Sequence, residues 1–183
     1  AGLRRHRRSI VAGADGRVLE VAAGTGLNLR HYRLADSVIA VDLSCEMVDR
    51  ISARTPPGDV RSFTATAAAE DLPFVDDLFD TVVLTLSLCT IPDAAKAVDE
   101  IKRVLKPGGS FRFLEHTLHR RRWIRALQRS FTPTWKKVAG GCHLDRATVE
   151  TIEQAGFEVT WSRRSGFGWL ALGVGVVNSQ PGS

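Results

Sequence analysis

The sequence has little cysteine and no long apolar run. No stretch of about 18 apolar residues occurs among its 183 positions, so we expect no transmembrane helix. The start, AGLRRHRRSIV, lacks the apolar core and cleavage site of a secretory signal. Cys45, Cys89 and Cys142 are too few and too widely spaced for a disulfide framework or a zinc motif. We therefore expect reduced thiols, a cytoplasmic protein and no metal site.

Composition and charge indicate a globular chain with two basic surfaces. Hydrophobic residues make up 44% and charged residues 25%, and the length fits one domain over 1–183. The net charge of +5 is concentrated in LRRHRR (3–8), within an expected basic helix at 1–12, and in HRRRWIRALQR (119–129). Such surfaces are typical of contact with nucleic acid, an anionic membrane or an acidic ligand.

Strand-like segments alternate with amphipathic helical segments, which predicts a parallel sheet covered by helices. Strands are expected at 17–22, 38–43, 60–65, 80–86 and 110–116, and helices at 26–34, 45–54, 93–105 and 146–155. Asp93 and Asp145 are the expected caps of the last two helices. The final segments, FEVTWSRR and LALGVGVV, are joined by a short loop, which favours an antiparallel hairpin. The sequence thus predicts an α/β fold with seven strands.

A glycine-rich turn follows the first strand, in VLEVAAGTGLNLRHY (18–32). Gly24 and Gly26 permit positive φ and close approach of a ligand to the backbone. A dinucleotide fingerprint needs a third glycine where Leu29 stands. An acid before the turn, Glu20, repels pyrophosphate but suits an ammonium group, which favours S-adenosylmethionine over NAD. Ala22 replaces the first glycine of [DE]-x-G-x-G-x-G and adds one methyl group that narrows the pocket, and we expect the alanine to be tolerated if its φ is negative.

The second strand ends in Asp42, within VIAVDLS. A carboxylate at this strand tip can accept hydrogen bonds from both hydroxyls of a ribose. A tight glycine turn followed by a helix-capping Asp42 is the alternative. Glu20 and Asp42 together favour the cofactor site.

Five motifs in order resemble class I S-adenosylmethionine-dependent methyltransferases. They are VLEVAAGTG, VDLS, AEDLPF (69–74), FDTVV (79–83) and RVLKPGGSFRFLEH (103–116), and the resemblance covers about 17–160. It implies a Rossmann-like, mostly parallel sheet with helices on both faces, a cofactor-binding core at 17–116, and S-adenosyl-L-homocysteine as the product. It also implies cofactor contacts from Glu20, Ala22, Ala23, Gly24, Thr25, Gly26, Asn28, Asp42, Leu43, Met47, Ala69, Glu70, Asp71, Thr85 and Leu86.

The resemblance assigns both ends of the donor. The residues that match Ala69 and Glu70 flank the adenine, and those that match Thr85 and Leu86 lie beside the sulfonium. Many members carry an acid where Ala68 stands. Its absence leaves adenine recognition to Glu70, Asp71 or backbone groups. Relatives that methylate quinones are similar in having alanine where Ala22 stands.

The acceptor is expected at the carboxyl ends of the fourth and fifth strands, beside Ser87, Cys89, Glu115 and His116. We name His116, with Glu115, as the candidate catalytic residues, because imidazole has a near-neutral pKa and can act as a general base. The alternative is that His116 only forms local hydrogen bonds. Transfer to an already reactive nucleophile needs only in-line positioning.

The segment 117–144 separates the fifth strand from the closing helix and hairpin at 145–178. Its Trp123, Ile124, Leu127 and Phe131 fall on one helical face among arginines. This face predicts either a surface helix packed on the sheet or a lid over the acceptor, in peripheral contact with an anionic membrane. Nucleic-acid binding is disfavoured, because no [ND]-P-P-[YF] motif follows the fourth strand.

The motifs LCTIPD, FLEHT, PTW and GGCHLDR resemble the alkyl thiol methyltransferase branch, and ubiquinone and menaquinone C-methyltransferases are also similar. The resemblance implies a small lipophilic acceptor, a thiol first, then a quinone or other aromatic, then a phospholipid amine. It also places Cys142 and His143 near the pocket, although this pair offers too few ligands for a metal. A non-catalytic S-adenosylmethionine-binding protein remains the alternative of another class. The sequence makes no prediction about the oligomeric state.

Overall fold

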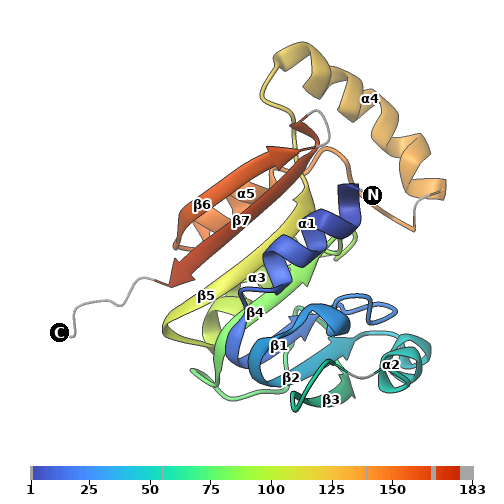
Figure 1. The fold of residues 1–183 in the computed structure, drawn as a ribbon. Coiled ribbons are helices and arrows are strands. Elements are labelled where there is room, and N and C mark those ends of the chain that lie inside the picture. The colour runs from blue at the N-terminus through green and yellow to red at the C-terminus, as the bar shows by residue number, and fades with distance from the viewer. Residues whose placement is uncertain (1, 55, 139, 166–167, 178–183) are drawn as a thin grey trace.

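The computed structural model describes residues 2–54, 56–138, 140–165 and 168–177. These residues form one seven-stranded sheet with helices on both faces (Figure 1). The strands are β1 (Asp15–Val21), β2 (Leu34–Asp42), β3 (Arg61–Thr66), β4 (Phe79–Thr85), β5 (Leu105–His116), β6 (Phe157–Ser165) and β7 (Leu170–Val177). The helices are α1 (Gly2–Val11), the 3-10 turn η1 (Leu29–His31), α2 (Cys45–Ser52), α3 (Ala94–Val104), α4 (Arg122–Val138) and α5 (Thr148–Gln154).

The strand order is β3-β2-β1-β4-β5-β7-β6. The first five strands pair in parallel, and β7 pairs antiparallel with both β5 and β6. The predicted mostly parallel sheet with a closing hairpin is therefore confirmed. The chain reverses its direction of travel across the sheet between β1 and β4, and a ligand crevice is expected at the carboxyl ends of these strands.

Two apolar cores cover the two faces of the sheet. On one face, Val11 of α1 and Ile51 of α2 pack with Val18 and Val38 of the first two strands. On the other face, the core contains Ile101 of α3 and Ile152 of α5, together with residues of β4 and β5. Figure 1 shows α1 in front of the sheet and α3 and α5 behind it. Burial on both faces explains why the inner part of each central strand is mainly apolar, with Val18, Leu19 and Val21 in β1 and VVL at 82–84 in β4.

The structure corrects the predicted helix at 26–34. Only the 3-10 turn Leu29–His31 forms there, because β2 already begins at Leu34. The side chains of Asn28 and Tyr32 turn inward and donate hydrogen bonds to Glu20, each at 2.9 Å. No α-helix dipole is therefore available at the end of the glycine turn. The fifth strand is also longer than predicted, since it begins at Leu105 rather than at 110.

Of the two predicted caps, one is confirmed. Asp93 Oδ1 accepts a hydrogen bond from Lys96 N–H at 3.0 Å and caps α3. Asp145 does not cap α5, which begins at Thr148 and has Ala147 at its N-cap. The intervening Arg146 is held outside the helix because its guanidinium donates to carbonyls of the loop after β4.

Helix α4 lies beyond the carboxyl end of β5, away from the main body of the sheet (Figure 1). Trp123, Leu127 and Phe131 are 65%, 55% and 46% exposed, so the predicted packing of this face on the sheet is not observed. The buried side of α4 is polar: Gln128 bonds the backbone of Thr117, His119 and Leu144. In the part of the chain that the structure describes, no helix is long and apolar enough to cross a membrane.

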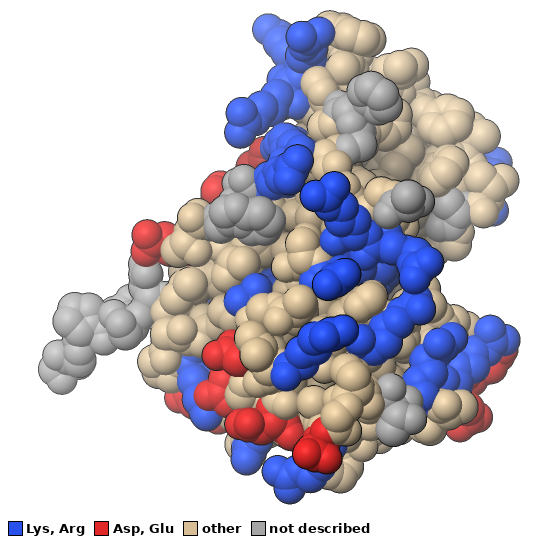
Figure 2. Space-filling view, viewed as in Figure 1, with Lys and Arg blue, Asp and Glu red and all other residues tan. Residues whose placement is uncertain are grey.

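Many of the basic residues lie on one side of the molecule. Figure 2 shows Lys and Arg gathered over α1 and toward the start of α4, while acidic and basic residues are mixed at the lower end of the view. Helix α1 supplies arginines from the first basic block, and α4 supplies most of the second. The two blocks separated in sequence therefore share one side of the fold.

Candidate active site

A cavity of about 300 Å³ opens at the carboxyl ends of β1, β2 and β4, at the reversal point of the sheet. Six predicted cofactor residues line it: Ala22, Gly24, Asp42, Leu43, Ala69 and Glu70. Ala67, Ser87, Thr90, Ile91 and Pro92 complete the lining. Gly26 instead faces a separate hollow beside Arg54, and a Cβ at Gly26 would meet that side chain at 3.0 Å.

The glycine turn has three positive φ angles, at Ala22, Gly24 and Gly26. Gly24 and Gly26 have φ of 57° and 70°, which glycine adopts without strain. Ala22 has φ of 51°, so the condition under which we expect the alanine to be tolerated, a negative φ, is not met. The next residue explains the bend, because Ala23 N–H donates to Val41 O at 2.9 Å and turns the chain toward β2.

Asp42 fixes this turn to the end of β2. Its Oδ2 accepts a hydrogen bond from Gly24 N–H at 2.8 Å, and its Oδ1 accepts one from Ser44 N–H at 3.0 Å. Ser44, rather than Asp42, is the N-cap of α2, and its Oγ accepts from Met47 N–H. The Asp42 carboxylate therefore lines the cavity and shapes the turn, but it does not cap the helix.

Glu20 lies in a buried polar network behind the turn. It is 1% exposed, and burial raises the pKa of its carboxyl to about 7. Besides Asn28 and Tyr32, this network includes Thr85 and Arg7 of α1. The Arg7 guanidinium donates to Thr85 Oγ1 at 2.6 Å and to Asn28 Oδ1 at 3.2 Å. Sequence reasoning missed Arg7, because only the basic character of its block was visible.

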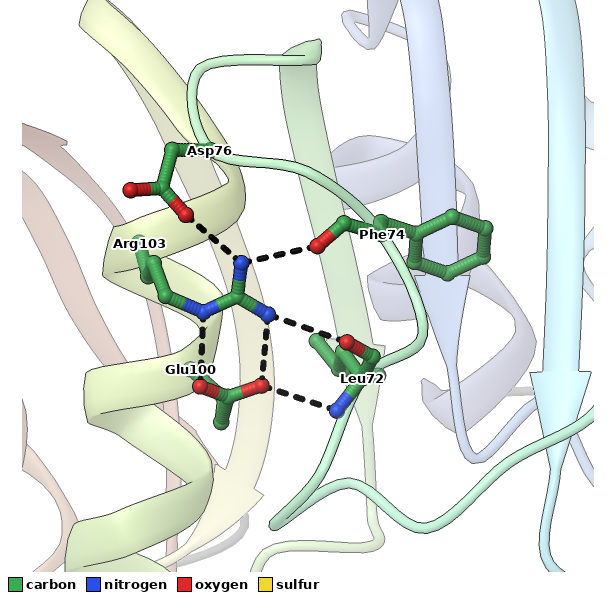
Figure 3. Close-up of polar contacts among 5 residues, drawn as sticks. All are labelled: Leu72, Phe74, Asp76, Glu100 and Arg103. Carbon is green, nitrogen blue, oxygen red and sulfur yellow. Dashed lines mark hydrogen bonds and ion pairs between the residues drawn. The ribbon is translucent and has the colours of Figure 1, made fainter.

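Arg103 braces the loop that follows Ala69 and Glu70 (Figure 3). Its guanidinium makes a bidentate contact with Glu100, two bonds of 2.8 Å, and donates to the carbonyls of Leu72 and Phe74 and to Asp76. Glu100 Oε2 also accepts from Leu72 N–H at 2.8 Å. These bonds fix the chain on the expected adenine side of the cavity. Asp71, another predicted contact, is exposed and is not part of the cavity lining.

A hydrogen bond to the buried carboxylate of Glu115 holds the loop after β4. Ser87 N–H donates to Glu115 Oε1 at 2.7 Å, and Glu115 Oε2 has no partner among the described residues. Glu115 is fully buried, and desolvation raises its pKa to about 7. Leu86, at the start of this loop, has φ of 58° and packs against Leu114. Both Glu115 and Leu86 therefore shape the loop rather than line the cavity.

His116 lies with two cysteines and does not line the cavity. Its Nδ1 is 3.8 Å from Cys89 Sγ and 3.5 Å from Cys142 Sγ, and the two sulfurs are 3.1 Å apart. The thiol–thiol contact lowers the pKa of Cys142 and raises the pKa of Cys89. The contact with Cys142 in turn raises the pKa of His116. His143, adjacent to Cys142 in sequence, instead faces Asp145 at 3.8 Å.

Comparison with known proteins agrees with the fold. A protein-family model described as "Methyltransferase domain" matches residues 19–113. Thiol S-methyltransferase TMT1B of Homo sapiens is 32% identical over 175 residues, which cover 91% of this chain and 72% of that protein. Demethylmenaquinone methyltransferase of Clavibacter sepedonicus is 39% identical over 103 residues, covering 56% and 42% of the two chains.

Solved structures show the same fold at low identity. An S-adenosylmethionine-dependent methyltransferase from Mesorhizobium loti has a TM-score of 0.71 at 17% identity, with 94% of this chain and 96% of that chain covered. The [4+2]-cyclase SpnF has a TM-score of 0.75 at 21% identity, with 97% and 80% covered.

The sheet order, the cavity at its reversal point and the acidic tip of β2 define a Rossmann-like, class I methyltransferase. The chain belongs to the methyltransferase domain family, and its cofactor is S-adenosylmethionine. Its methyl acceptor is a small molecule.

Proposed function

We propose that this methyltransferase transfers the methyl group to the sulfur of a small lipophilic thiol. The observation that carries the proposal is the cavity lining next to the loop after β4, where Ser87 and Thr90 are the polar side chains. The described ionisable residues of the cavity are Asp42 and Glu70, which belong to the ribose and adenine ends. A thiol suits such a site, because its thiolate is a strong nucleophile and needs no general base during the transfer. The similarity to a thiol S-methyltransferase supports the same acceptor.

We assign the donor to this cavity residue by residue. Asp42 binds the ribose hydroxyls, Ala69 and Glu70 flank the adenine, and the glycine turn lies under the methionine part. Glu20 supplies the negative charge that matches the donor ammonium. Arg7 supplies a positive charge at the same end, where its guanidinium already reaches Asn28 and Thr85, and it pairs with the donor carboxylate.

The reaction is a direct displacement. The thiolate sulfur attacks the methyl carbon in line with the bond to the donor sulfur. That bond breaks with its electrons moving to the donor sulfur, which yields a methyl thioether and S-adenosyl-L-homocysteine. Glu115 positions the loop between Ser87 and Cys89 through the Ser87 N–H and is a positioning residue in this scheme. Catalysis then comes from orientation and the exclusion of water.

A quinone carbon is the second candidate acceptor. The Clavibacter demethylmenaquinone methyltransferase supports it, although the matched segment covers only 42% of that protein. A carbon acceptor loses a proton after methyl transfer and needs a base. The sequence singled out His116 with Glu115 for that role, but neither side chain lines the cavity, which favours the thiol.

Turnover against a panel of acceptors tests the proposal. Labelled S-adenosylmethionine would be offered with an alkyl thiol, an aryl thiol, a demethylated quinone and phosphatidylethanolamine vesicles, and the products identified by mass spectrometry. We expect a methyl thioether. A methylated quinone or lipid without a thioether would overturn the thiol assignment. Tight donor binding without turnover on any acceptor would favour a non-catalytic binding protein.

We further propose that α4 contacts an anionic membrane and forms the predicted lid of the acceptor site. Its exposed Trp123, Leu127 and Phe131 are accompanied on the helix by Arg122, Arg125, Arg129, Lys136 and Lys137. An exposed apolar face among cations is the pattern of an interfacial helix. A cavity of about 470 Å³ lies between α4 and His143, which leaves room for an acceptor below the helix.

Cosedimentation with vesicles tests the membrane contact. We expect binding to vesicles that contain phosphatidylserine and little binding to pure phosphatidylcholine. The double variant Trp123→Ser, Phe131→Ser should lose this binding, whereas Phe63→Ser, an exposed apolar residue of β3, should retain it. Equal binding by both variants would contradict a role for α4.

A further inference from the structure

Three side chains from distant parts of the chain bring sulfur and nitrogen atoms together beside the cofactor cavity. Cys89 lies in the loop after β4, His116 ends β5, and Cys142 lies between α4 and α5. Their ligand atoms all lie within 4.8 Å of one another. We propose that Cys89, His116 and Cys142 form a binding site for one thiophilic divalent metal ion, with zinc as its ordinary occupant.

The distances between the three atoms suit a tetrahedral ion. With metal–sulfur bonds of about 2.3 Å and metal–nitrogen bonds of about 2.0 Å, ligand atoms of a tetrahedral site lie about 3.5–3.8 Å apart. The imidazole nitrogen lies 3.8 Å from Cys89 Sγ and 3.5 Å from Cys142 Sγ, inside this range. The sulfur–sulfur distance of 3.1 Å is shorter, and a small rotation of either Cys side chain would widen it.

The framework around the three ligands is fixed without help from the thiols. His143 N–H donates to Cys89 O at 2.8 Å, which ties the two cysteine-bearing segments together. Arg146 donates to Leu88 O and Ile91 O on both sides of Cys89. The carbonyl of His116 accepts a hydrogen bond from Thr148 Oγ1 at 2.8 Å. The backbone positions that carry the ligands are therefore held before a metal binds, which lowers the ordering cost of binding.

The donor set selects the class of metal. Thiolates and imidazole favour zinc or copper(I), whereas magnesium, calcium and manganese prefer oxygen ligands. Cys89 and Cys142 are 1% and 6% exposed and pack in an apolar cluster with Leu144, Trp135 and Trp169. Such an apolar shell limits solvent access and hydrolytic loss of the ion. The described residues supply three ligands, so one tetrahedral position remains for an outside ligand, the arrangement of an open zinc site.

Metal titration of the full chain tests the site without donor or acceptor, so the result does not depend on the thiol assignment. Protein purified under reducing conditions and stripped with a chelator would be titrated with zinc against a chromophoric chelator, and separately with cobalt(II). We expect one zinc per chain, and thiolate-to-metal charge-transfer absorption with cobalt. X-ray absorption at the zinc edge should show two sulfur ligands and at least one nitrogen ligand.

Variants assign the ion to these residues. Cys89→Ser and Cys142→Ser should each weaken zinc binding by at least roughly tenfold, since even changes behind the ligands cost that much. Cys45→Ser, which alters an exposed cysteine elsewhere, should bind zinc as the parent does. Circular dichroism of the stripped proteins would show that the variants fold. Stripped parent protein that binds no zinc, zinc bound without sulfur ligands, or a Cys89–Cys142 disulfide recovered from the reduced preparation would each overturn the site.

Discussion

Replacing Ala22 by glycine should stabilise the protein. Ala22 has φ of 51°, in the left-handed region, where an L-residue with a Cβ pays about 1–2 kcal/mol. Glycine relieves that strain but gives the unfolded chain more freedom, which costs about 0.4–1 kcal/mol. The balance is a rise of about 0.8 kcal/mol in the free energy of unfolding, from a range of roughly 0–1.6 kcal/mol. For a chain of this size, that corresponds to roughly 1–4 °C in Tm.

The assay is thermal or urea unfolding of the donor-free protein, followed by circular dichroism. Ala23→Gly is the matched control, because Ala23 has no positive φ and glycine there only adds freedom to the unfolded chain. The control should lose about 0.4–1 kcal/mol. If Ala22→Gly destabilises the protein as much as Ala23→Gly does, then Ala22 carries no strain and the reasoning is refuted. Because Ala22 also lines the cavity, the glycine variant should bind the donor at least as tightly.

Substitutions at three further residues test the donor site and its support. Glu20 has a pKa of about 7 and must be ionised to bind the donor ammonium. Donor affinity, measured by calorimetry, should therefore fall about tenfold per pH unit below about pH 7. Glu20→Gln should abolish this pH dependence, although Arg7 and Tyr32 remain next to position 20. The same raised pKa makes the free energy of unfolding fall as pH rises from 4.5 to about 7. Glu20→Gln should reduce this slope, and the part that remains belongs to Glu115, whose pKa is also raised to about 7; a slope unchanged in Glu20→Gln would assign it to groups other than Glu20. Asp42→Ala should weaken donor binding by roughly 1–3 kcal/mol and Asp42→Asn by less, because asparagine keeps one oxygen acceptor. Unchanged affinity in both variants would show that the ribose does not bind at Asp42. Arg103→Lys should lower the free energy of unfolding by about 1–3 kcal/mol, because one ammonium group cannot make all the hydrogen bonds of the guanidinium. The control Arg50→Lys, in the exposed pair with Glu46, should change it by less than about 0.5 kcal/mol. Similar losses in both variants would contradict the bracing role of Arg103.

The features predicted correctly from the sequence are those that depend on local pattern. The strands of the parallel sheet, the cap of α3 by Asp93 and the closing hairpin each follow from residues that are neighbours in sequence. The sequence also placed Asp42 and the glycine turn in one site, because adjacent parallel strands end at the same edge of a sheet, and the two are hydrogen-bonded in the structure.

The errors and omissions come from contacts between distant residues. The helix expected at 26–34 is lost because Asn28 and Tyr32 satisfy the buried Glu20, which no periodicity reveals. Arg7 meets Thr85 across 78 positions, and its block looked like a solvated surface. Cys89, His116 and Cys142 belong to three elements, so their spacing carries no metal-binding signature. The sequence placed Cys89 and His116 at the ends of neighbouring strands and Cys142 near the pocket, but it did not show that the three side chains meet.

Two strained residues explain how the cavity opens at this edge of the sheet. Ala22 follows β1 and Leu86 follows β4, and both have left-handed backbone, φ of 51° and 58°. Each bend is fixed by an adjacent strand, since Ala23 N–H donates to Val41 O and Leu86 N–H donates to Leu114 O. Ser87 Oγ also donates to Ala22 O at 3.2 Å, which joins the two bends. Strain of this kind persists only where the surrounding structure fixes it. The sheet thus holds both bends in place, and the cavity opens beside them, lined by Ala22 from one bend and Ser87 from the other.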